Sequence, residues 1–185
     1  MLFRSPNALN KNTTGNYNTA VGSSDNVVGS PLQNNTTGAY NIAVGNGALA
    51  NNTTGNNNSA FGHQALVSNT TASNNTAVGY QALYSQTTPA YPNTAVGYQA
   101  GYSITTGYGN TLIGHTAGYS LTSGSGNTFV GPSNSAASNP SGYYITTGSA
   151  NTILGGYNGN QGGLDIRTAS NYIVLSDGAG NPRMY

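Results

Sequence analysis

A five-residue block, Asn-Thr-Ala-Val-Gly or a close variant, returns along nearly the whole chain and limits its possible folds more than any other feature. The glycines that close successive blocks lie 23, 17, 17, 18, 17, 17 and 24 residues apart, by subtraction of their numbers. The blocks are Asn18–Gly22, Asn41–Gly45, Asn58–Gly62, Asn75–Gly79, Asn93–Gly97, Asn110–Gly114, Asn127–Gly131 and Asn151–Gly155. So regular an interval predicts a repeat fibre and not a globular enzyme.

Each block is preceded by a turn and followed by a second apolar step. A Thr-Thr-Gly turn or a variant of it ends seven residues before the closing glycine, as in Thr53-Thr54-Gly55. An Ala-Leu pair or a related pair begins three residues after that glycine, as in Ala48-Leu49. The unit is therefore a turn, a short strand, a glycine corner and a second short strand. Because this unit is too small to bury its own core, the sequence predicts an all-β solenoid of stacked repeats.

Composition excludes several classes of protein and partner. Charged residues make up 4% of the chain, and none occurs between Asp25 and Asp165. Uncharged amides, hydroxyls and small hydrophobic residues suit stacked β-structure, in which identical groups form ladders. The net charge of +1 gives no electrostatic footprint for nucleic acid, and no apolar stretch is long enough for membrane insertion. We therefore expect neither nucleic acid nor membrane as a partner.

The third and fourth residues of every block are apolar, for example Ala77-Val78 and Leu112-Ile113. Because neighbouring residues of a strand point to opposite faces, both faces are expected to be covered. One face would fill the coil and the other would meet a second chain. Asn7-Ala8-Leu9 matches the middle of a repeat, so the first repeat is incomplete and a longer fibre or a covering subunit is expected.

Tandem Asn-Thr-Ala-Val-Gly blocks, with Tyr80-Gln81-Ala82-Leu83 and Asn-Asn-Thr-Thr-Gly between them, resemble the repeat arrays of bacteriophage tail fibres. They are also similar to the head repeats of trimeric autotransporter adhesins of the YadA type. The resemblance covers residues 7–155. It implies a left-handed parallel β-roll in which three chains intertwine as a homotrimeric fibre.

The sequence divides into two parts. Residues 1–155 form the tandem-repeat β-roll, with longer loops at 23–32 and 132–143 and an additional short strand expected at 25–29. Residues 156–185 form a C-terminal segment leading out of the array, where charge returns. Within it, residues 171–178 read as a strand followed by a turn.

Two aromatic columns are the candidate surface-binding sites. The first contains the residues that directly follow a closing glycine, and the second contains residues four positions later. They are His63, Tyr80, Tyr98 and His115 in the first column and Tyr84, Tyr102 and Tyr119 in the second. Aromatic side chains on a fibre surface suit carbohydrate stacking, whereas the alternative is a structural ladder that joins neighbouring coils.

Catalytic and metal-binding chemistry finds no support in the pattern. The chain contains no Glu or Cys, and its three Asp residues lie outside the regular array. No carboxylate pair, Ser-His-Asp set, phosphate loop or metal-ligand spacing follows from it. We expect no enzyme activity, no metal and no cofactor.

Asn-x-Ser/Thr triplets are abundant, at Asn12, Asn35, Asn52, Asn69 and Asn74 among others. In a eukaryotic secretory setting they would accept glycans. The phage-like pattern instead favours amide and hydroxyl ladders at the coil turns.

The predicted function is that of a structural protein of a phage tail fibre or similar appendage. It would support or mediate multivalent attachment to a bacterial surface polysaccharide or protein, in a virion or outside the cell. The alternative is a subunit of a cellular extracellular filament or adhesin. An ice-binding solenoid is less favoured, because the Thr pairs belong to turns and not to a flat strand column.

Overall fold

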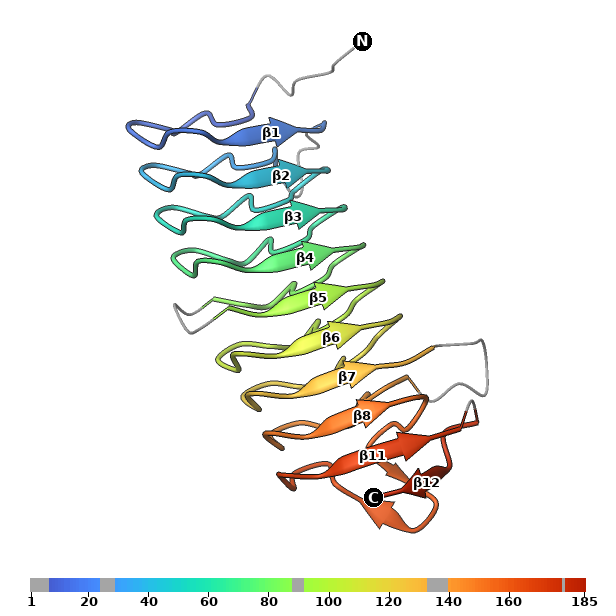
Figure 1. Cartoon of the computed structure of the whole chain (residues 1–185). Helices are drawn as coiled ribbons and strands as arrows, with labels where there is room; N and C mark the ends of the chain where they lie inside the picture. Colours follow the sequence, from blue (N-terminus) through green and yellow to red (C-terminus); the bar gives the residue numbers. More distant parts are fainter. Residues whose placement is uncertain (1–6, 24–28, 88–91, 133–139, 178) are drawn as a thin grey trace.

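The computed structural model describes residues 7–23, 29–87, 92–132, 140–177 and 179–185. In these residues twelve strands and no helix occur, and ten of the strands form one sheet along the molecule (Figure 1). The strands are β1 (Thr19–Val21), β2 (Ile42–Val44), β3 (Ser59–Phe61), β4 (Thr76–Val78), β5 (Thr94–Val96), β6 (Thr111–Ile113), β7 (Thr128–Val130), β8 (Thr152–Leu154), β9 (Asn160–Gln161), β10 (Leu164–Asp165), β11 (Ile173–Ser176) and β12 (Pro182–Met184). The predicted all-β solenoid of stacked coils is confirmed.

Equal positions of the repeat lie above one another. Strands β1 to β8 and β11 pair in parallel, and Ala77 of β4, for example, pairs with Ala95 of β5. Both alanines are fully buried, whereas Val78 is 36% exposed. The third residue of each five-residue block therefore fills the interior of the coil, and the fourth residue lies on the outer face of the sheet.

The return segment, which runs from each glycine corner back to the next turn, is not the second strand expected from the sequence. Residues 46–51 and 63–68 form turns. Leu49 and Leu66 have φ values of 49° and 53°, in the left-handed region, which a strand does not contain. Their backbone groups still reach the next coil, since Leu49 N–H donates to Ala65 O at 3.0 Å. Hydrogen bonds therefore join neighbouring coils along the return segments as well as along the strands.

The corner at the end of each block requires glycine. Gly79 has a φ of +134°, and a Cβ added to it would lie 2.6 Å from the carbonyl carbon of Gly97 in the next coil. Glycine alone combines this backbone conformation with so close an approach. The glycine corner expected from the sequence is confirmed.

The core exchanges large and small residues part-way along the solenoid. In earlier coils a strand alanine such as Ala77 packs in one cluster with a leucine of the return segment, Leu66. In later coils the strand residue is larger, as at Leu112, and Gly101 takes the place of the leucine. A Cβ on Gly101 would lie 2.9 Å from the Leu112 side chain. The return segment of these later coils still contributes a large buried residue, as at Ile104, so the interior stays filled from both sides.

Asparagines of the Asn-x-Ser/Thr triplets form a ladder at the coil turns, as predicted. Asn35 Nδ2 donates to Asn12 Oδ1 at 2.7 Å, Asn52 to Asn35 at 2.8 Å and Asn69 to Asn52 at 2.8 Å. Asn35, Asn52 and Asn69 are fully buried. Asn74 differs, because it is exposed and has a φ of 65° outside this ladder.

A second ladder is formed by the asparagine that opens each block. Asn58 Nδ2 donates to Asn41 Oδ1 at 3.1 Å and to Ala72 O at 2.8 Å. Its Oδ1 accepts hydrogen bonds from the backbone N–H and the Nδ2 of Asn75, at 3.0 and 3.1 Å. Buried polar groups are costly unless they are paired, and this repeat pairs them across coils.

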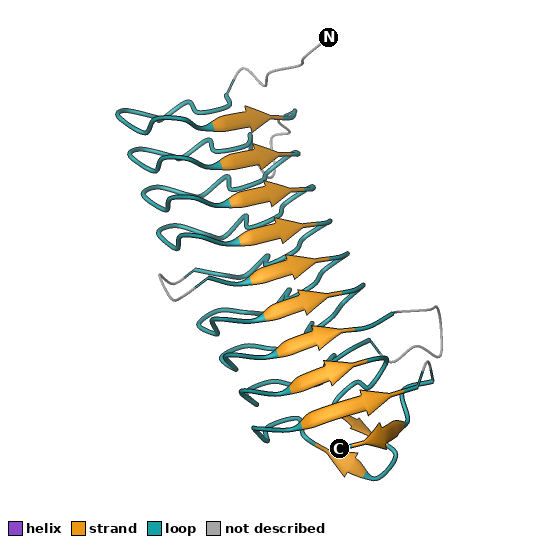
Figure 2. Cartoon of the chain, viewed as in Figure 1, coloured by secondary structure: helices purple, strands orange, loops and turns teal. Residues whose placement is uncertain are grey.

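The segment after residue 155 adds three features to the end of the solenoid (Figure 2). Strands β9 and β10 form an antiparallel hairpin, β11 continues the large sheet beside β8, and β12 returns antiparallel to β11. Strand β11 lies in the stretch predicted to be a strand. Of the loops expected at 23–32 and 132–143, residues 24–28 and 133–139 lie outside the described residues, as does most of the additional strand expected at 25–29.

Candidate functional site

The first predicted aromatic column is a continuous stack. The ring centroids of His63 and Tyr80 lie 5.4 Å apart, those of Tyr80 and Tyr98 5.1 Å, and those of Tyr98 and His115 4.9 Å, with interplanar angles of 9–13°. Each ring directly follows a glycine corner, so the four rings occupy the same position in successive coils. The coil spacing, about 4.8 Å for hydrogen-bonded strands, then sets the ring spacing.

The second predicted column is also a stack. Tyr84 lies 4.9 Å from Tyr102, and Tyr102 lies 5.1 Å from Tyr119, with interplanar angles of 12° and 7°. Burial raises the pKa of Tyr102, and the hydroxyls of Tyr84, Tyr119 and Tyr80 add smaller effects in the same direction.

Three further tyrosines that the sequence pattern did not indicate also lie in such stacks. Tyr143 continues the second column 5.1 Å from Tyr119, beyond the long interval that interrupts the repeat. The shared Gly-Tyr pair at 101–102, 118–119 and 142–143 was the signal that could have found it. Tyr17 and Tyr40 form a separate stack at 5.0 Å, each two residues after a turn glycine.

Stacking limits what these columns can bind. Rings about 5 Å apart turn their faces toward each other, so an inner ring offers a ligand only its edge and hydroxyl. Tyr98, for example, is 44% exposed but has a stacked ring on either side. Such contacts contribute about 0.5–1.5 kcal/mol each and join neighbouring coils. The geometry favours the structural ladder, and ligand binding by these seven residues stays a prediction.

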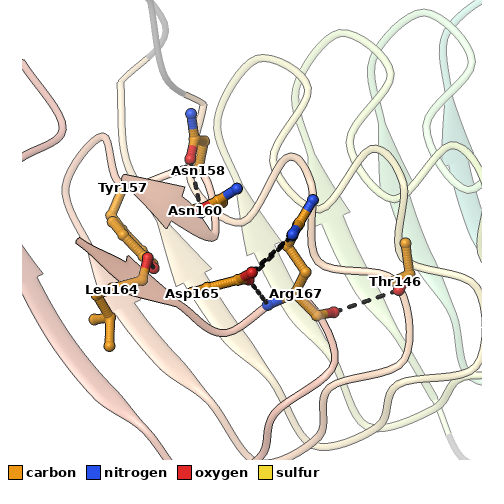
Figure 3. A network of polar contacts seen from close by, with 7 residues as sticks. All are labelled: Thr146, Tyr157, Asn158, Asn160, Leu164, Asp165 and Arg167. Carbon is orange, nitrogen blue, oxygen red and sulfur yellow. Dashed lines mark hydrogen bonds and ion pairs between the residues drawn. The ribbon is translucent and has the colours of Figure 1, made fainter. Parts of the chain in front are cut away.

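A groove of about 520 Å³ lies beyond the second column, near the C-terminal end of the solenoid. Its polar wall includes Asp165 and Arg167, which Figure 3 shows side by side. The lining residues are Ser120, Tyr144, Thr146, Asp165, Arg167 and Thr168. The return of charge in this segment is visible in the sequence, but the sequence pattern did not indicate a site here.

Asp165 and Arg167 form a bidentate ion pair at this groove. Arg167 Nη2 lies 2.7 Å from Asp165 Oδ2, and Arg167 Nε donates to Oδ1 at 3.0 Å. The side-chain hydrogen bond from Arg167 is the main cause that lowers the pKa of Asp165. Thr146 fixes the pair to the preceding coil, because its N–H donates to Arg167 O at 2.9 Å.

Tyr157 fixes the β9–β10 hairpin that carries Asp165 (Figure 3). Its side chain is fully buried, and its hydroxyl donates to Leu164 O at 2.7 Å. Burial is the main cause that raises the Tyr157 pKa to about 12, and Asp165 adds to the shift.

The raised pKa of Tyr157 predicts an alkaline loss of stability. The folded state holds this proton more tightly than the unfolded chain, whose tyrosines titrate near a pKa of about 10. The contribution is complete below about pH 10 and is lost as pH rises toward about 12, by up to about 2 kcal/mol. We expect urea unfolding at pH 7, 10 and 11.5 to show this fall in the free energy of unfolding.

Tyr157→Phe should flatten that fall, at a cost of about 1 kcal/mol at pH 7 for the lost hydrogen bond. Tyr98→Phe, which removes an exposed hydroxyl, is the matched control and should keep the wild-type pH dependence. An unchanged slope in Tyr157→Phe would contradict the assignment.

The described residues do not assemble other chemistry. They contain no group of three or more His, Asp or Glu side chains that could hold a metal ion. His63 and His115 stand at opposite ends of the first column, with two tyrosines between them. The described part of the chain contains no helix long and apolar enough to span a membrane.

Comparisons with protein-family models, with curated proteins and with solved structures find no match to this chain.

Proposed function

We propose that this chain is the shaft of a homotrimeric fibre that supports multivalent attachment to a bacterial cell surface, as part of a phage tail fibre or a similar appendage. The observation that carries the proposal is an apolar column left exposed on the outer face of the large sheet. Phe61, Val78, Ile113 and Leu154 in this column are 36–44% exposed.

The column favours association along its whole length. Its members occupy the fourth position of consecutive blocks and stack in register from β1 to β8. Monomeric soluble proteins rarely expose a continuous apolar patch of this kind. Burial of each large side chain would contribute about 1.5–3 kcal/mol, repeated at every coil.

A stiff rod with repeated coils suits attachment by avidity. Three parallel copies would present three copies of any weak surface site, and linked weak sites bind more tightly than one site alone. The left-handed, intertwined arrangement belongs to the proposal and rests on the resemblance of the repeats to phage fibres and YadA-type heads. Location in a virion or outside the cell follows from the same proposal.

The oligomeric state tests the proposal. Native mass in solution should be near three times 18.7 kDa, and electron microscopy should show short rods. Phe61→Asn with Ile113→Asn should lower the mass toward that of one chain. Thr54→Asn with Thr106→Asn, at exposed turns before the same two strands, should leave the mass unchanged. A wild-type monomer, or a rod that binds no bacterial cells and occurs in no virion, would contradict it.

Long polymers in that measurement would favour the alternative, an extracellular filament or adhesin. A monomer would favour ice binding, for which the structure adds one observation. The Thr pairs of the turns lie outside the strands, but the second position of each block places Thr76, Thr94 and Thr111 in a strand column. Regular hydroxyl rows of this kind can order water, so thermal hysteresis of the monomer would separate the two functions.

A further inference from the structure

Tyr144 differs from every ring of the two columns. Its only ring contact among the described residues is edge-on to Tyr143, at 4.9 Å and 86°. It is 50% exposed and lines the groove near the end of the solenoid. In contrast to the inner rings of the two columns, Tyr144 therefore has an aromatic face that no parallel ring of a described residue covers.

Hydrogen-bonding groups of both kinds surround this ring. Asp165 and Arg167 are hydrogen-bonded to each other, but the guanidinium has further N–H donors besides the two that the ion pair engages. The hydroxyls of Ser120 and Thr168 form no hydrogen bond with another described residue. Carboxylate, guanidinium and hydroxyls together can accept from and donate to a ligand that carries many hydroxyl groups.

We propose that this groove binds a neutral saccharide. The ring of Tyr144 would pack against the C–H face of one sugar, whose polarised hydrogens suit the negative face of an aromatic ring. Asp165, Arg167 and the hydroxyls would bond its hydroxyl groups. The groove volume of about 520 Å³ lies within the range of small-molecule sites.

Charge argues for a neutral ligand over an anionic one. Asp165 and Arg167 cancel each other, and the chain has no other charged residue between Asp25 and Asp177. A phosphate or carboxylate would have to compete with Asp165 for the guanidinium. A neutral sugar can bond both partners while the ion pair stays intact.

The groove lies away from the proposed association face. Ser120 and Tyr144 belong to return segments, whereas the apolar column lies on the outer side of the strands. Each chain of a fibre would therefore present its own groove. The inference rests on the proposed function for its purpose, since attachment needs a surface ligand, but its evidence comes from different residues.

Titration with neutral oligosaccharides tests it. Maltotriose, cellotriose, chitotriose and mannotriose would be followed by saturation-transfer NMR and calorimetry, with inorganic phosphate and glucuronate as anionic probes. At least one neutral sugar should bind, and Tyr144→Ala should weaken it roughly ten-fold or more. Arg167→Met should also weaken it. Tyr98→Ala, which removes a similarly exposed but stacked ring, should leave it unchanged.

No binding of any of these neutral sugars, binding of the anions alone, or equal loss in Tyr98→Ala would overturn the proposal. Thermal unfolding of each variant verifies the fold. Native mass measured on the same samples separates the two proposals. A trimer that binds no sugar would contradict only the saccharide site, and a monomer that binds sugar would contradict only the trimeric fibre.

Discussion

Gly79→Ala is expected to destabilise the solenoid by about 3–5 kcal/mol. The new Cβ would lie 2.6 Å from the carbonyl carbon of Gly97 and closer still to its oxygen, and these are backbone atoms of the next coil. The residue would also keep a φ of +134°, which non-glycine residues rarely adopt. The coils would have to separate at this corner, which also opens the hydrogen bond from Gly97 N–H to Val78 O at 2.8 Å.

Urea unfolding followed by circular dichroism measures this loss, and the matched control is Gly163→Ala. Gly163 also has a positive φ, of +83°, but a Cβ there meets nothing within 4 Å. The control should therefore cost only about 1 kcal/mol, from backbone strain alone. Equal losses in the two variants would show that strain, and not the contact between coils, fixes the corner glycine.

The repeat made the strands, the corners and the two aromatic columns predictable. A constant interval places equal residues at equal points of a coil, so any aromatic residue directly after the closing glycine must stack, as Tyr80 and Tyr98 do. The return segment was not predictable in this way. Leu49 and Leu66 look like strand residues, and only the tight coil forces them into the left-handed conformation.

The core exchange was visible in the sequence but needed the fold for its interpretation. Leu66 and Leu83 give way to Gly101 and Gly118 at the same position of the repeat, a change that signals altered packing. Its reason is a strand residue such as Leu112 that already fills the coil.

The terminal groove could not be predicted, because it brings together residues that the repeat does not relate. Tyr144 follows the interrupted interval, and Asp165 comes from a hairpin that the sequence did not indicate. The register between a return segment and that hairpin depends on three-dimensional contacts such as the bond from Thr146 to Arg167.

The opening asparagine of each block should be as sensitive to substitution as the corner glycine. Asn58→Ala leaves the carbonyl of Ala72 and the backbone N–H of Asn75 without the amide that satisfies them. Each orphaned buried group costs about 1–3 kcal/mol, so we expect a loss of about 3–5 kcal/mol in the free energy of unfolding. Asn51→Ala is the control, because that exposed side chain accepts one bond, from Asn34, and should cost less than about 1 kcal/mol.

Asn58→Asp separates hydrogen bonding from side-chain volume. The substitution keeps the shape but replaces the Nδ2 donor with an oxygen that faces Asn41 Oδ1 and Ala72 O. Burial and these two oxygens should raise the folded pKa of the new carboxyl above the unfolded value of about 3.9. Its protonated form, which can donate one hydrogen bond, then carries the stability, so the variant should be more stable near pH 4 than at pH 7. Equal stability at the two pH values, or a loss no larger than that of Asn51→Ala, would show that the ladder acts by packing alone.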